Sequence, residues 1–583
     1  MPLKFRLVKP REETHPTRRK TSVGSASLCR ALFAIGLVSL MLGLASRAEA
    51  VSTQVWVQET YADFNEGEGA GVRVVSKGFL QPGMLLGKSA LKGVSFVFSM
   101  VETAQGVVMG TGDGGEIWLD SGRGPKKVTA LKGAVVVTAL LPWKGSTVLA
   151  GTLPEGKIFS VDLSSGKAKL FSKVGAKHIW CMAKNPRRDE VFVGTGPEGK
   201  VFRVSSGGKA SLYWDSPEKH ILSMSYGPSS GSGRGGGLGG PYVGSAPKAI
   251  VYKLLGRGKA RAIHDFDATE VRALSGNSKV LYAAVNKMKP ATIGYPKVKP
   301  SKGKGTAIKK RKVPGSKACR KIPRKGAKKG KGGVFRLWET GAVEQLHGLG
   351  KSYFTALEVT PEGDVYAGEG RRGQVFWLGK DGSLATVADV KERQVMALSL
   401  TGKMPALATG DSGVLYKRKK AGARRYVSEV LNAKIASRWG RLEWRGSRGV
   451  KVEVRSGNTA EADKSWSSWV PLRRVSRTLS GAAGQVGAPA GQYLQYRVVW
   501  PGRAGAAVKV EGLKLYFVPM NRQAKVVEIR VHDQKSENKK SGVSKAGWLS
   551  KITTDAPDEM KIQWKVGNPD GDPLWYLVAY RGE

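Results

Sequence analysis

The sequence predicts an all-β protein, a seven-bladed β-propeller followed by an antiparallel β-sandwich domain. Glycine accounts for 77 of the 583 residues, about twice its average usage of roughly 7%, which favours tight turns and short strands. A unit of about 40 residues recurs seven times between residues 107 and 418. The recurrence stops after Lys420, where alternating strands of another kind begin. A chain of this length can bury a core in more than one domain.

Residues 1–50 are expected to be an export signal. An apolar run of fifteen residues, 31–45, is followed by "AEA" at 48–50, a small-x-small cleavage site. An uncleaved membrane anchor is the alternative, but a span needs about 20 apolar residues. Cys29 precedes the run, whereas a lipid-bearing cysteine would follow it, so a lipid anchor is not indicated. Basic residues lead into the run: Arg18, Arg19, Lys20 and Arg30.

Only two cysteines, Cys181 and Cys319, remain beyond the expected signal. A scaffold held together by several disulfides is therefore excluded. One bridge between the two remains an alternative, although Cys181 fits better as a buried strand residue.

The formal charge of +50 is unevenly distributed. Residues 287–331 contain eighteen Lys and Arg and no acid, whereas residues 1–50 carry nine Lys and Arg against three Glu. The charge therefore combines one tail-like basic tract with a generally basic surface.

The recurring unit contains an apolar strand that ends in glycine, a turn and a second strand, as in "VFVGTGPEGKVFRV" at 191–204. Successive copies lie 40 to 50 residues apart, except for one interval of 84 that contains the basic tract. A period near 40 with four short strands per unit is typical of a β-propeller. The aligned positions are Gly110, Gly151, Gly194, Gly244, Ala284, Gly368 and Ala408.

One copy divides into four strands, "HIWCMAKN", "DEVFVGTG", "GKVFRVSS" and "KASLYWDS", here called strands a to d. The apolar alternation and the β-branched content fit strands, and glycine clusters interrupt every alternative amphipathic helix. Seven copies predict seven blades over 51–425. Residues 51–90 should complete the first or last blade and close the ring, which removes exposed sheet edges.

The segments "GTGDGGEIWLD" and "GTGPEGKVFRV" resemble exported bacterial propeller repeats of the two-component-regulator, NHL and WD-repeat-like kind. The resemblance covers about residues 51–425 and implies a propeller fold. Such propellers serve in sensing, scaffolding and, occasionally, catalysis, so the resemblance does not specify a function.

The strand order places two insertions. In a propeller, the b–c and d–a loops share one face, and the a–b and c–d loops share the other. The basic tract 287–331 interrupts b–c of the fifth copy, and the Gly/Ser-rich stretch 227–241 interrupts a–b of the fourth, so they should emerge on opposite faces. Both lack the apolar residues of a core and are expected to be disordered.

Residues 426–533 are expected to form the β-sandwich, because alternating strands there are bounded by Gly, Pro and Asn turns. Their "RSGNT…WSSW" and "GQYLQYRV" segments resemble a module that follows propellers in some exported bacterial proteins. A linker, 534–554, leads to 555–583, which resembles the first strands of a fibronectin type III or cadherin-like module. Either these strands belong to a truncated module, or they pair with the preceding sandwich.

Known catalytic and metal motifs find little support. The glycine-rich turns could be phosphate loops, but a strand follows each one where a phosphate loop needs a helix N-terminus. The sequence contains no His-x-His pair and no Gly-x-Ser-x-Gly elbow with plausible partners. Acidic turns at 112–116 and 568–572 lack the full spacing of a calcium loop. We therefore expect neither a cofactor nor a metal.

One set of polar residues occurs at the same position in several copies of the repeat. Each lies just before or at the start of strand a in its copy, so all of them should ring the mouth of the central channel. The sharper hypothesis is a ligand site on this face, and the alternative is that each side chain solvates a loop. The candidates are His178, His220, Glu270, Tyr353 and Gln394.

The basic tract has two interpretations. It could bind anionic cell-surface polymers, lipid headgroups or extracellular nucleic acid through counterion release, or it could be a tolerated insertion. Tyr295 is its only aromatic residue, so base stacking is not indicated. The polyanion-binding candidates are Lys309, Lys310, Arg311, Lys312, Arg320, Lys321, Arg324, Lys325, Lys328 and Lys329.

The first prediction is an exported, non-enzymatic propeller that binds or scaffolds a partner at the cell envelope. The location would be the periplasm, the outer membrane surface or the extracellular space. The partner would be a protein or an anionic envelope polymer, and nucleic acid would bind only through the basic tract. We expect a monomer without a transmembrane segment after cleavage. The alternatives are a propeller lyase, lactonase or hydrolase using the channel-mouth residues, and a cationic polyanion-binding surface protein.

Overall fold

The computed structural model describes residues 53–227, 241–277, 279–288, 330–447, 449–500, 507–520, 524–533 and 560–567, with 574 and 576. The predicted export signal, most of both insertions and the linker 534–554 lie outside these residues. Within them, no helix is long and apolar enough to cross a membrane.

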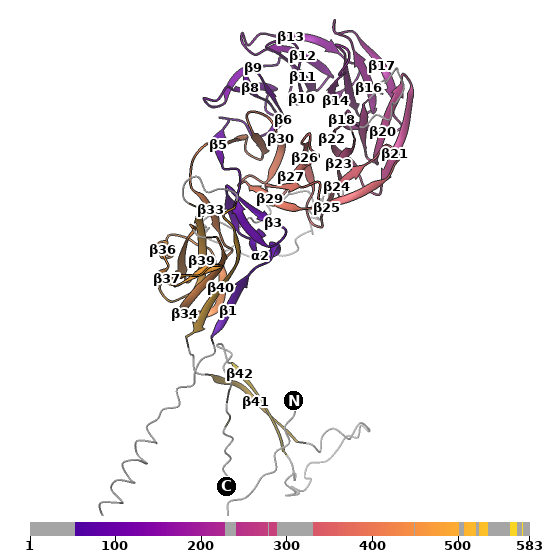
Figure 1. The fold of residues 1–583 in the computed structure, drawn as a ribbon. Coiled ribbons are helices and arrows are strands. Elements are labelled where there is room, and N and C mark those ends of the chain that lie inside the picture. The colour runs from indigo at the N-terminus through magenta and orange to yellow at the C-terminus, as the bar shows by residue number, and fades with distance from the viewer. Residues whose placement is uncertain are drawn as a thin grey trace, which may run out of the picture. The chain divides into compact units, whose positions relative to one another are not determined.

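Antiparallel four-stranded sheets are arranged around a ring (Figure 1). Six of them are separate sheets. They comprise β6 (Val97–Thr103), β7 (Gly106–Thr111), β8 (Glu116–Asp120) and β9 (Lys126–Ala130); β10 (Val136–Pro142), β11 (Thr147–Leu153), β12 (Lys157–Asp162) and β13 (Ala168–Lys173); β14 (His178–Lys184), β15 (Val191–Gly196), β16 (Lys200–Val204) and β17 (Ala210–Asp215); β18 (His220–Ser225), β19 (Tyr242–Ala246), β20 (Ala249–Gly256) and β21 (Lys259–Phe266); β22 (Glu270–Gly276), β23 (Leu281–Met288), β24 (Gly330–Leu337) and β25 (Val343–Leu349); and β30 (Gln394–Ser399), β31 (Ala406–Gly410), β32 (Val414–Arg418) and β5 (Leu86–Ala90).

The prediction of a seven-bladed propeller is corrected to six blades, each a separate four-stranded sheet. A further four-strand set occupies the ring between β22 and β30: β26 (Phe354–Val359), β27 (Val365–Glu369), β28 (Gln374–Leu378) and β29 (Leu384–Asp389). This set is not a separate sheet, because β29 pairs with β3 (Val72–Val75) and so continues into a sixteen-stranded sheet. The period alone could not reveal the fusion, since β3 lies far from β29 in the sequence.

The aligned glycines are explained by close packing between neighbouring sets. A Cβ added at Gly194 would lie 2.5 Å from Cys181 Sγ and 2.8 Å from Ile221 Cγ2, and Ile221 belongs to the next set. Distances this short require a neighbour to move. The left-handed glycine that the turn needs is a different residue, Gly199, with φ of +60°.

The apolar core of the ring lies between the four-strand sets. In the described residues, buried apolar side chains form a cluster at each junction; one of them joins Leu149 and Ile158 to Ile179 and Val193. This is the expected arrangement when each sheet buries its faces only against its neighbours.

Hydrogen bonds also join the first strands of neighbouring sets. At five junctions a hydroxyl or thiol donates to a carbonyl of the next first strand. The bonds are Ser99 Oγ to Val137 O (3.0 Å), Thr138 Oγ1 to Ile179 O (2.6 Å), Cys181 Sγ to Ile221 O (3.6 Å), Ser223 Oγ to Val271 O (2.9 Å) and Thr355 Oγ1 to Val395 O.

The ring closes through the N-terminal strand β5, which pairs with β32. Lys88 on β5 forms a 2.6 Å ion pair with the buried Glu392, which also accepts a 2.7 Å hydrogen bond from Tyr416. Burial opposes ionisation of Glu392, but these two hydrogen bonds, a backbone hydrogen bond and the charge of Lys88 together lower its pKa. Of the residues 51–90 expected to complete a blade, only β5 does so.

The remaining N-terminal strands pair with the C-terminal ones. The strands of this region are β1 (Gln54–Gln58), β2 (Glu68–Ala70), β4 (Phe79–Pro82), β33 (Arg424–Val427), β34 (Leu431–Gly446), β35 (Lys451–Gly457), β36 (Val470–Pro471), β37 (Arg473–Arg477), β38 (Gly481–Gln485), β39 (Gly491–Trp500) and β40 (Val510–Pro519). Their core includes Leu80, Trp439, Leu442 and Trp500. Hydrogen bonding connects them into one sheet with β3 and β26–β29, so a sandwich of two packed sheets stays a prediction.

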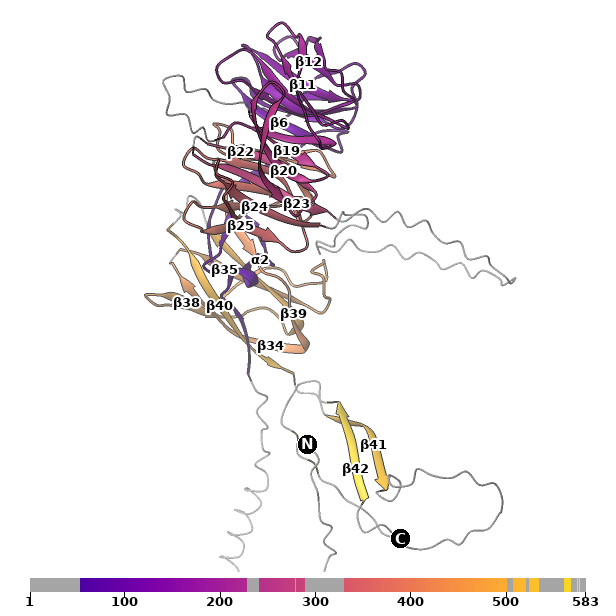
Figure 2. The ribbon, with the colours of Figure 1, turned by 90° about the vertical axis from the view of Figure 1, so that its right-hand side faces the viewer.

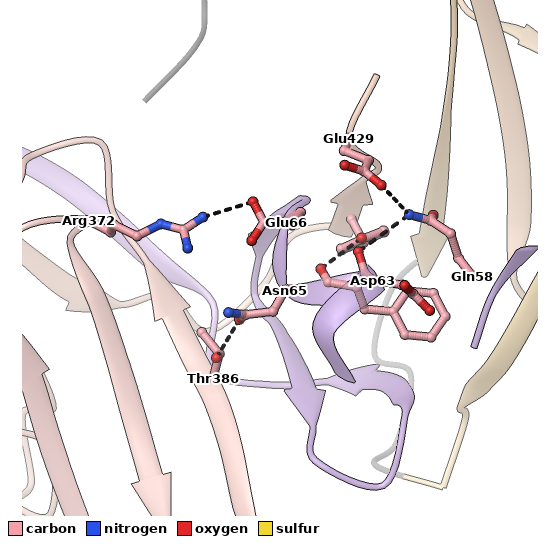
Figure 3. A network of polar contacts seen from close by, with 9 residues as sticks. Gln58, Asp63, Asn65, Glu66, Arg372, Thr386 and Glu429 are labelled. Atoms are coloured by element: carbon pink, nitrogen blue, oxygen red, sulfur yellow. Dashed lines mark hydrogen bonds and ion pairs between the residues drawn. The ribbon is translucent and has the colours of Figure 1, made fainter. Parts of the chain in front are cut away.

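A short helix, α2 (Tyr61–Asn65), lies where the ring meets this second region (Figure 3). Thr386 Oγ1 donates to Asn65 Oδ1 at 2.7 Å, and Arg372 forms a 3.3 Å ion pair with Glu66. On the other side, Gln58 Nε2 donates to Glu429 Oε1 at 3.3 Å. Polar contacts therefore connect the segment of α2 with the ring on one side, and β1 with Glu429 on the other.

The last described strands form a separate two-stranded sheet (Figure 2). β41 (Lys525–Asp533) pairs antiparallel with β42 (Met560–Gly567). The predicted domain limits at 533 and 555 stay predictions, as does the fibronectin-like character of the final segment.

Candidate functional site

The five predicted site residues occupy one register position of the ring. His178 pairs with Gly196, His220 with Ala246, Glu270 with Asn286 and Gln394 with Gly410. Tyr353 immediately precedes β26, and its carbonyl accepts the Gly370 N–H at 2.9 Å. Each therefore lies at the start of a first strand, opposite the end of the second. In Figure 1 these first strands border the centre of the ring.

Two of the five residues meet through a tryptophan that sequence reasoning missed. Trp180 Nε1 donates to His220 Nδ1 at 3.2 Å. The Trp180 ring centroid lies 5.3 Å from that of His178 and 5.9 Å from that of His220, with edge-to-face geometry in both cases. Trp180 therefore connects histidines of adjacent sheets, and all three side chains are partly exposed.

Trp180 occupies a β-bulge, which explains its direction. The β14–β15 register shifts between Ile179 and Cys181, leaving Trp180 without a cross-strand partner. A bulge turns one extra side chain away from the regular alternation. A Cβ at Gly196 would lie under 3.0 Å from both Trp180 Nε1 and His220 Nδ1, so only glycine leaves room for this pair.

Two further predicted residues also touch each other. Gln394 Nε2 donates to the Tyr353 hydroxyl at 2.9 Å. A Cβ at Gly410 would lie 3.0 Å from Gln394 Oε1 and 2.5 Å from the ring of Phe96, which places Phe96 beside Gln394. Phe96 in turn stacks on Phe98 with ring centroids 5.4 Å apart. A second polar and aromatic group thus lies at the same end of the ring.

Glu270, the fifth candidate, contacts an asparagine. Asn286 Nδ2 donates to Glu270 Oε1 at 2.9 Å and to Phe354 O at 2.8 Å. The sequence signal for Asn286 was available, since it stands where other copies have Gly196 or Gly410.

Two candidates carry buried polar atoms without a hydrogen-bond partner among the described residues, namely His178 Nδ1 and Gln394 Oε1. Such atoms are uncommon in folded proteins, because losing water without gaining a partner costs about 1–3 kcal/mol. A bound ligand that donated or accepted here would remove that cost.

The environment of His220 favours its neutral form. Burial lowers the His220 pKa, and the nearby His178 and Lys219 lower it further. Since Nδ1 accepts the Trp180 N–H, the neutral ring carries its proton on Nε2. Protonation of Nδ1 would break this hydrogen bond.

No metal centre is apparent in the described part of the chain, where no group of three or more His, Cys, Asp or Glu side chains is placed to hold an ion. The predicted enzyme alternative is not tested by this observation.

The ten polyanion-binding candidates lie outside the described residues, but the stem of their tract is visible. β23 and β24 remain paired up to Met288 and Gly330. Both ends of the tract therefore leave the ring at the end that carries His178 and Gln394. Lys287 in the stem forms a 2.7 Å ion pair with Asp267.

Solved structures resemble the chain only distantly. A virginiamycin B lyase from Staphylococcus aureus is 10% identical, with 57% of this chain and 99% of that chain covered and a TM-score of 0.42. The extracellular domain of the one component system BT4673 from B. thetaiotaomicron is 11% identical, covering 68% and 50%, with a TM-score of 0.40. Kuenenia stuttgartiensis hydrazine synthase is 12% identical, covering 56% and 97%, with a TM-score of 0.41. No functional inference follows from similarities of this size.

Neither a protein-family model nor a curated protein sequence matches the chain.

Proposed function

We propose that the protein is a non-enzymatic binding or scaffold propeller whose partner contacts the end of the ring that carries His178, Trp180 and His220. The observation that carries the proposal is the pair of buried atoms, His178 Nδ1 and Gln394 Oε1, without hydrogen-bond partners in the described residues. Both belong to the set that shares one register position, so a ligand at this end could satisfy both.

The chemistry of this end suits a partner with flat apolar and polar groups. Trp180 and Phe96 offer partly exposed aromatic faces, and His220 retains an Nε2 donor. Aromatic side chains provide much contact area at little cost in side-chain entropy. A protein segment or an envelope polymer combines such features.

The finer parts of the proposal rest on the sequence. Export through residues 1–50 would put the protein in the periplasm, at the outer membrane surface or outside the cell. A β-sandwich within residues 426–533 would act as a second module, and the protein would be a monomer. The basic tract would add electrostatic attraction at the same end of the ring.

The test begins with capture of partners from envelope extract by the full chain, followed by titration calorimetry with the purified partner. Trp180→Ala and His178→Ala should each weaken binding about 10-fold or more, because they remove an aromatic contact and a polar atom. Lys184→Ala, at the opposite end of β14, is the matched control. Each variant is first checked for an unchanged melting temperature.

A variant lacking residues 289–329, measured at low and high salt, separates the ring from the tract. If this deletion abolished binding while Trp180→Ala and His178→Ala left it intact, the partner would be held by the tract, and the proposal would be wrong.

A further inference from the structure

The hairpin between β37 and β38 combines strong positive charge with an exposed apolar tip. Leu479 at its tip is 95% exposed, more than any other large hydrophobic residue in the described part of the chain. Val475 on β37 is 43% exposed. A single exposed apolar residue is common on protein surfaces. Here, however, three exposed arginines lie beside Leu479 and Val475 in the hairpin: Arg473, Arg474 and Arg477.

A groove lies directly beside this tip. It has a volume of about 220 Å³, and its wall includes Thr478 and Ser480, the two neighbours of Leu479. The opposite side comes from the neighbouring strands β34 and β40, whose outward cations line it: Arg441, Arg445 and Lys514.

The strand register explains why these cations converge. Arg441 pairs across the sheet with Gln485, which also pairs with Arg473. Arg445 pairs with Gly481 and with Gly512, neither of which has a side chain to cover it. Alternate residues of one strand share a face, so Arg441 and Arg445 both point outward over a floor of small residues.

The acids at the groove do not neutralise it. Arg441 forms an ion pair with Glu443 at 3.1 Å, and Arg445 forms an ion pair with Glu59 at 3.7 Å. All four side chains are at least 36% exposed, and ion pairs of this kind are weak and exchange readily. Among the described residues, Lys514 has no ion-pair partner. The face therefore retains positive charge and free N–H donors.

We propose that this face docks on an anionic lipid membrane, with a lipid phosphate in the groove and Leu479 inserted among the acyl chains. Arginine forks bind phosphate through paired hydrogen bonds. Peripheral proteins gain membrane affinity from basic residues near anionic headgroups together with apolar side chains buried at the interface. The docking site is separate from the ring end of the proposed function and does not depend on it.

The apolar tip favours a membrane over a dissolved polyanion. A soluble phosphate polymer would use the groove and the arginines but would leave Leu479 in water. A membrane buries the leucine and binds the phosphate at once, because the tip and the groove share Thr478 and Ser480.

The first experiment measures flotation of the full chain with vesicles of phosphatidylcholine containing 30% phosphatidylglycerol. Leu479→Ser should weaken binding about 10-fold through the lost apolar contact. Arg441→Gln combined with Lys514→Gln should weaken it at least as much and reduce its salt dependence. Lys132→Gln combined with Lys209→Gln removes the same charge from exposed positions of the ring and is the control.

Gly512→Val tests the groove without altering any charge. A Cβ there would lie 3.4 Å from Arg445 Nη2 and from Glu59 Cβ, which is ordinary contact, so the strand should tolerate valine while the groove becomes partly filled. We expect a several-fold loss of binding to the same vesicles with an unchanged melting temperature.

The second experiment distinguishes docking at this face from attraction by the basic tract. An environment-sensitive fluorophore is attached through Leu479→Cys in a chain with Cys29→Ser and Cys319→Ser. Cys181 remains unlabelled, because burial raises the pKa of its thiol to about 12. The same label at Leu170→Cys, an exposed position of β13, is the control.

The expected result is a blue shift at position 479, and none at 170, on adding the anionic vesicles. The proposal is overturned if position 479 shows no shift, or if both labels shift equally. It is also overturned if heparin binds as tightly as the vesicles and Leu479→Ser affects neither, since the groove would then serve a soluble polyanion.

Discussion

Two junctions of the ring differ in how their first strands are joined. The junction between β18 and β22 uses one hydroxyl, Ser223, which donates to Val271 O. The junction between β22 and β26 has Ala273 at the equivalent position and uses Asn286 on the second strand instead. Its amide donates to Phe354 O and accepts from Phe354 N at 2.9 Å. One side chain therefore makes two bonds where the common junction makes one.

The difference coincides with the insertion. Asn286 lies two residues before the end of β23, where the β23–β24 pair lengthens into the stem of the basic tract. A strand pair that extends beyond its neighbours has fewer sheet contacts to hold it there. We infer that the Asn286 amide holds the β23–β24 stem in place at the last position where β26 is close enough to hydrogen-bond.

Gly194→Val would break a common junction and should have the largest effect. The added side chain meets Cys181 and Ile221, including the backbone oxygen of Ile221 at 3.1 Å from its Cβ. Overpacking costs about 1–3 kcal/mol, and more where backbone has to move. Urea unfolding should therefore show a large fall in midpoint. Gly207→Ala, in open space between β16 and β17, is the control and should leave the free energy of unfolding within about 0.5 kcal/mol of wild type.

The repeat was therefore predictable, but the fusion was not. Glycines such as Gly194 recur along the repeat because neighbouring strand sets approach each other closely at these positions. The recurrence is therefore enough to predict the ring. The β29–β3 pairing joins residues about 300 positions apart and leaves no periodic trace. Likewise residues 51–90 were expected to close the ring, and β5 does so, whereas the pairing of β1 with β40 depends on tertiary contacts that no local pattern encodes.

Asn286→Ala should destabilise the protein by about 2–3 kcal/mol, because it leaves both backbone groups of the buried Phe354 unpaired. Ser223→Ala, its counterpart at a common junction, removes one donor and should cost about 1 kcal/mol. Urea unfolding of the two variants side by side measures the difference. Equal costs would contradict the idea that the β22–β26 junction is more strongly linked.

The same unusual junction should respond to pH. His347 on β25 packs against Phe354 and Phe376, with ring centroids 6.1 and 4.9 Å away, and burial lowers its pKa to about 4. Its unfolded value is about 6.5, so the unfolded state binds more protons between those values and stability falls as pH drops. Up to about 2 kcal/mol should be lost between pH 7.5 and 5.

Urea midpoints across this range test the effect, and His347→Leu should flatten the slope because leucine has no proton to bind. The interpretation would be excluded if the variant kept the slope of the wild type, since another group would then be titrating.

The candidate site was only half predictable, for a physical reason. Position in the repeat was enough to place five residues at one register position, because each lies at or just before the start of a first strand: His178, His220, Glu270, Tyr353 and Gln394. It could not identify Trp180, whose exposure depends on a bulge between Ile179 and Cys181. A bulge changes which face a residue occupies without changing the hydrophobic pattern enough to be seen.

Cys181→Ser makes the smallest change and sharpens the comparison most. Cys181 Sγ stands where Ser99 and Ser223 place a hydroxyl, and its 3.6 Å contact with Ile221 O is the weakest kind of bond in the series. Serine should donate a stronger bond to the same carbonyl, while its smaller oxygen loses some apolar contact. The two effects nearly cancel, so the free energy of unfolding measured with urea should change by less than about 0.5 kcal/mol. A loss of 2 kcal/mol or more would show that this junction depends on the volume of sulfur, and that the hydroxyl pattern of its neighbours is incidental to joining the ring.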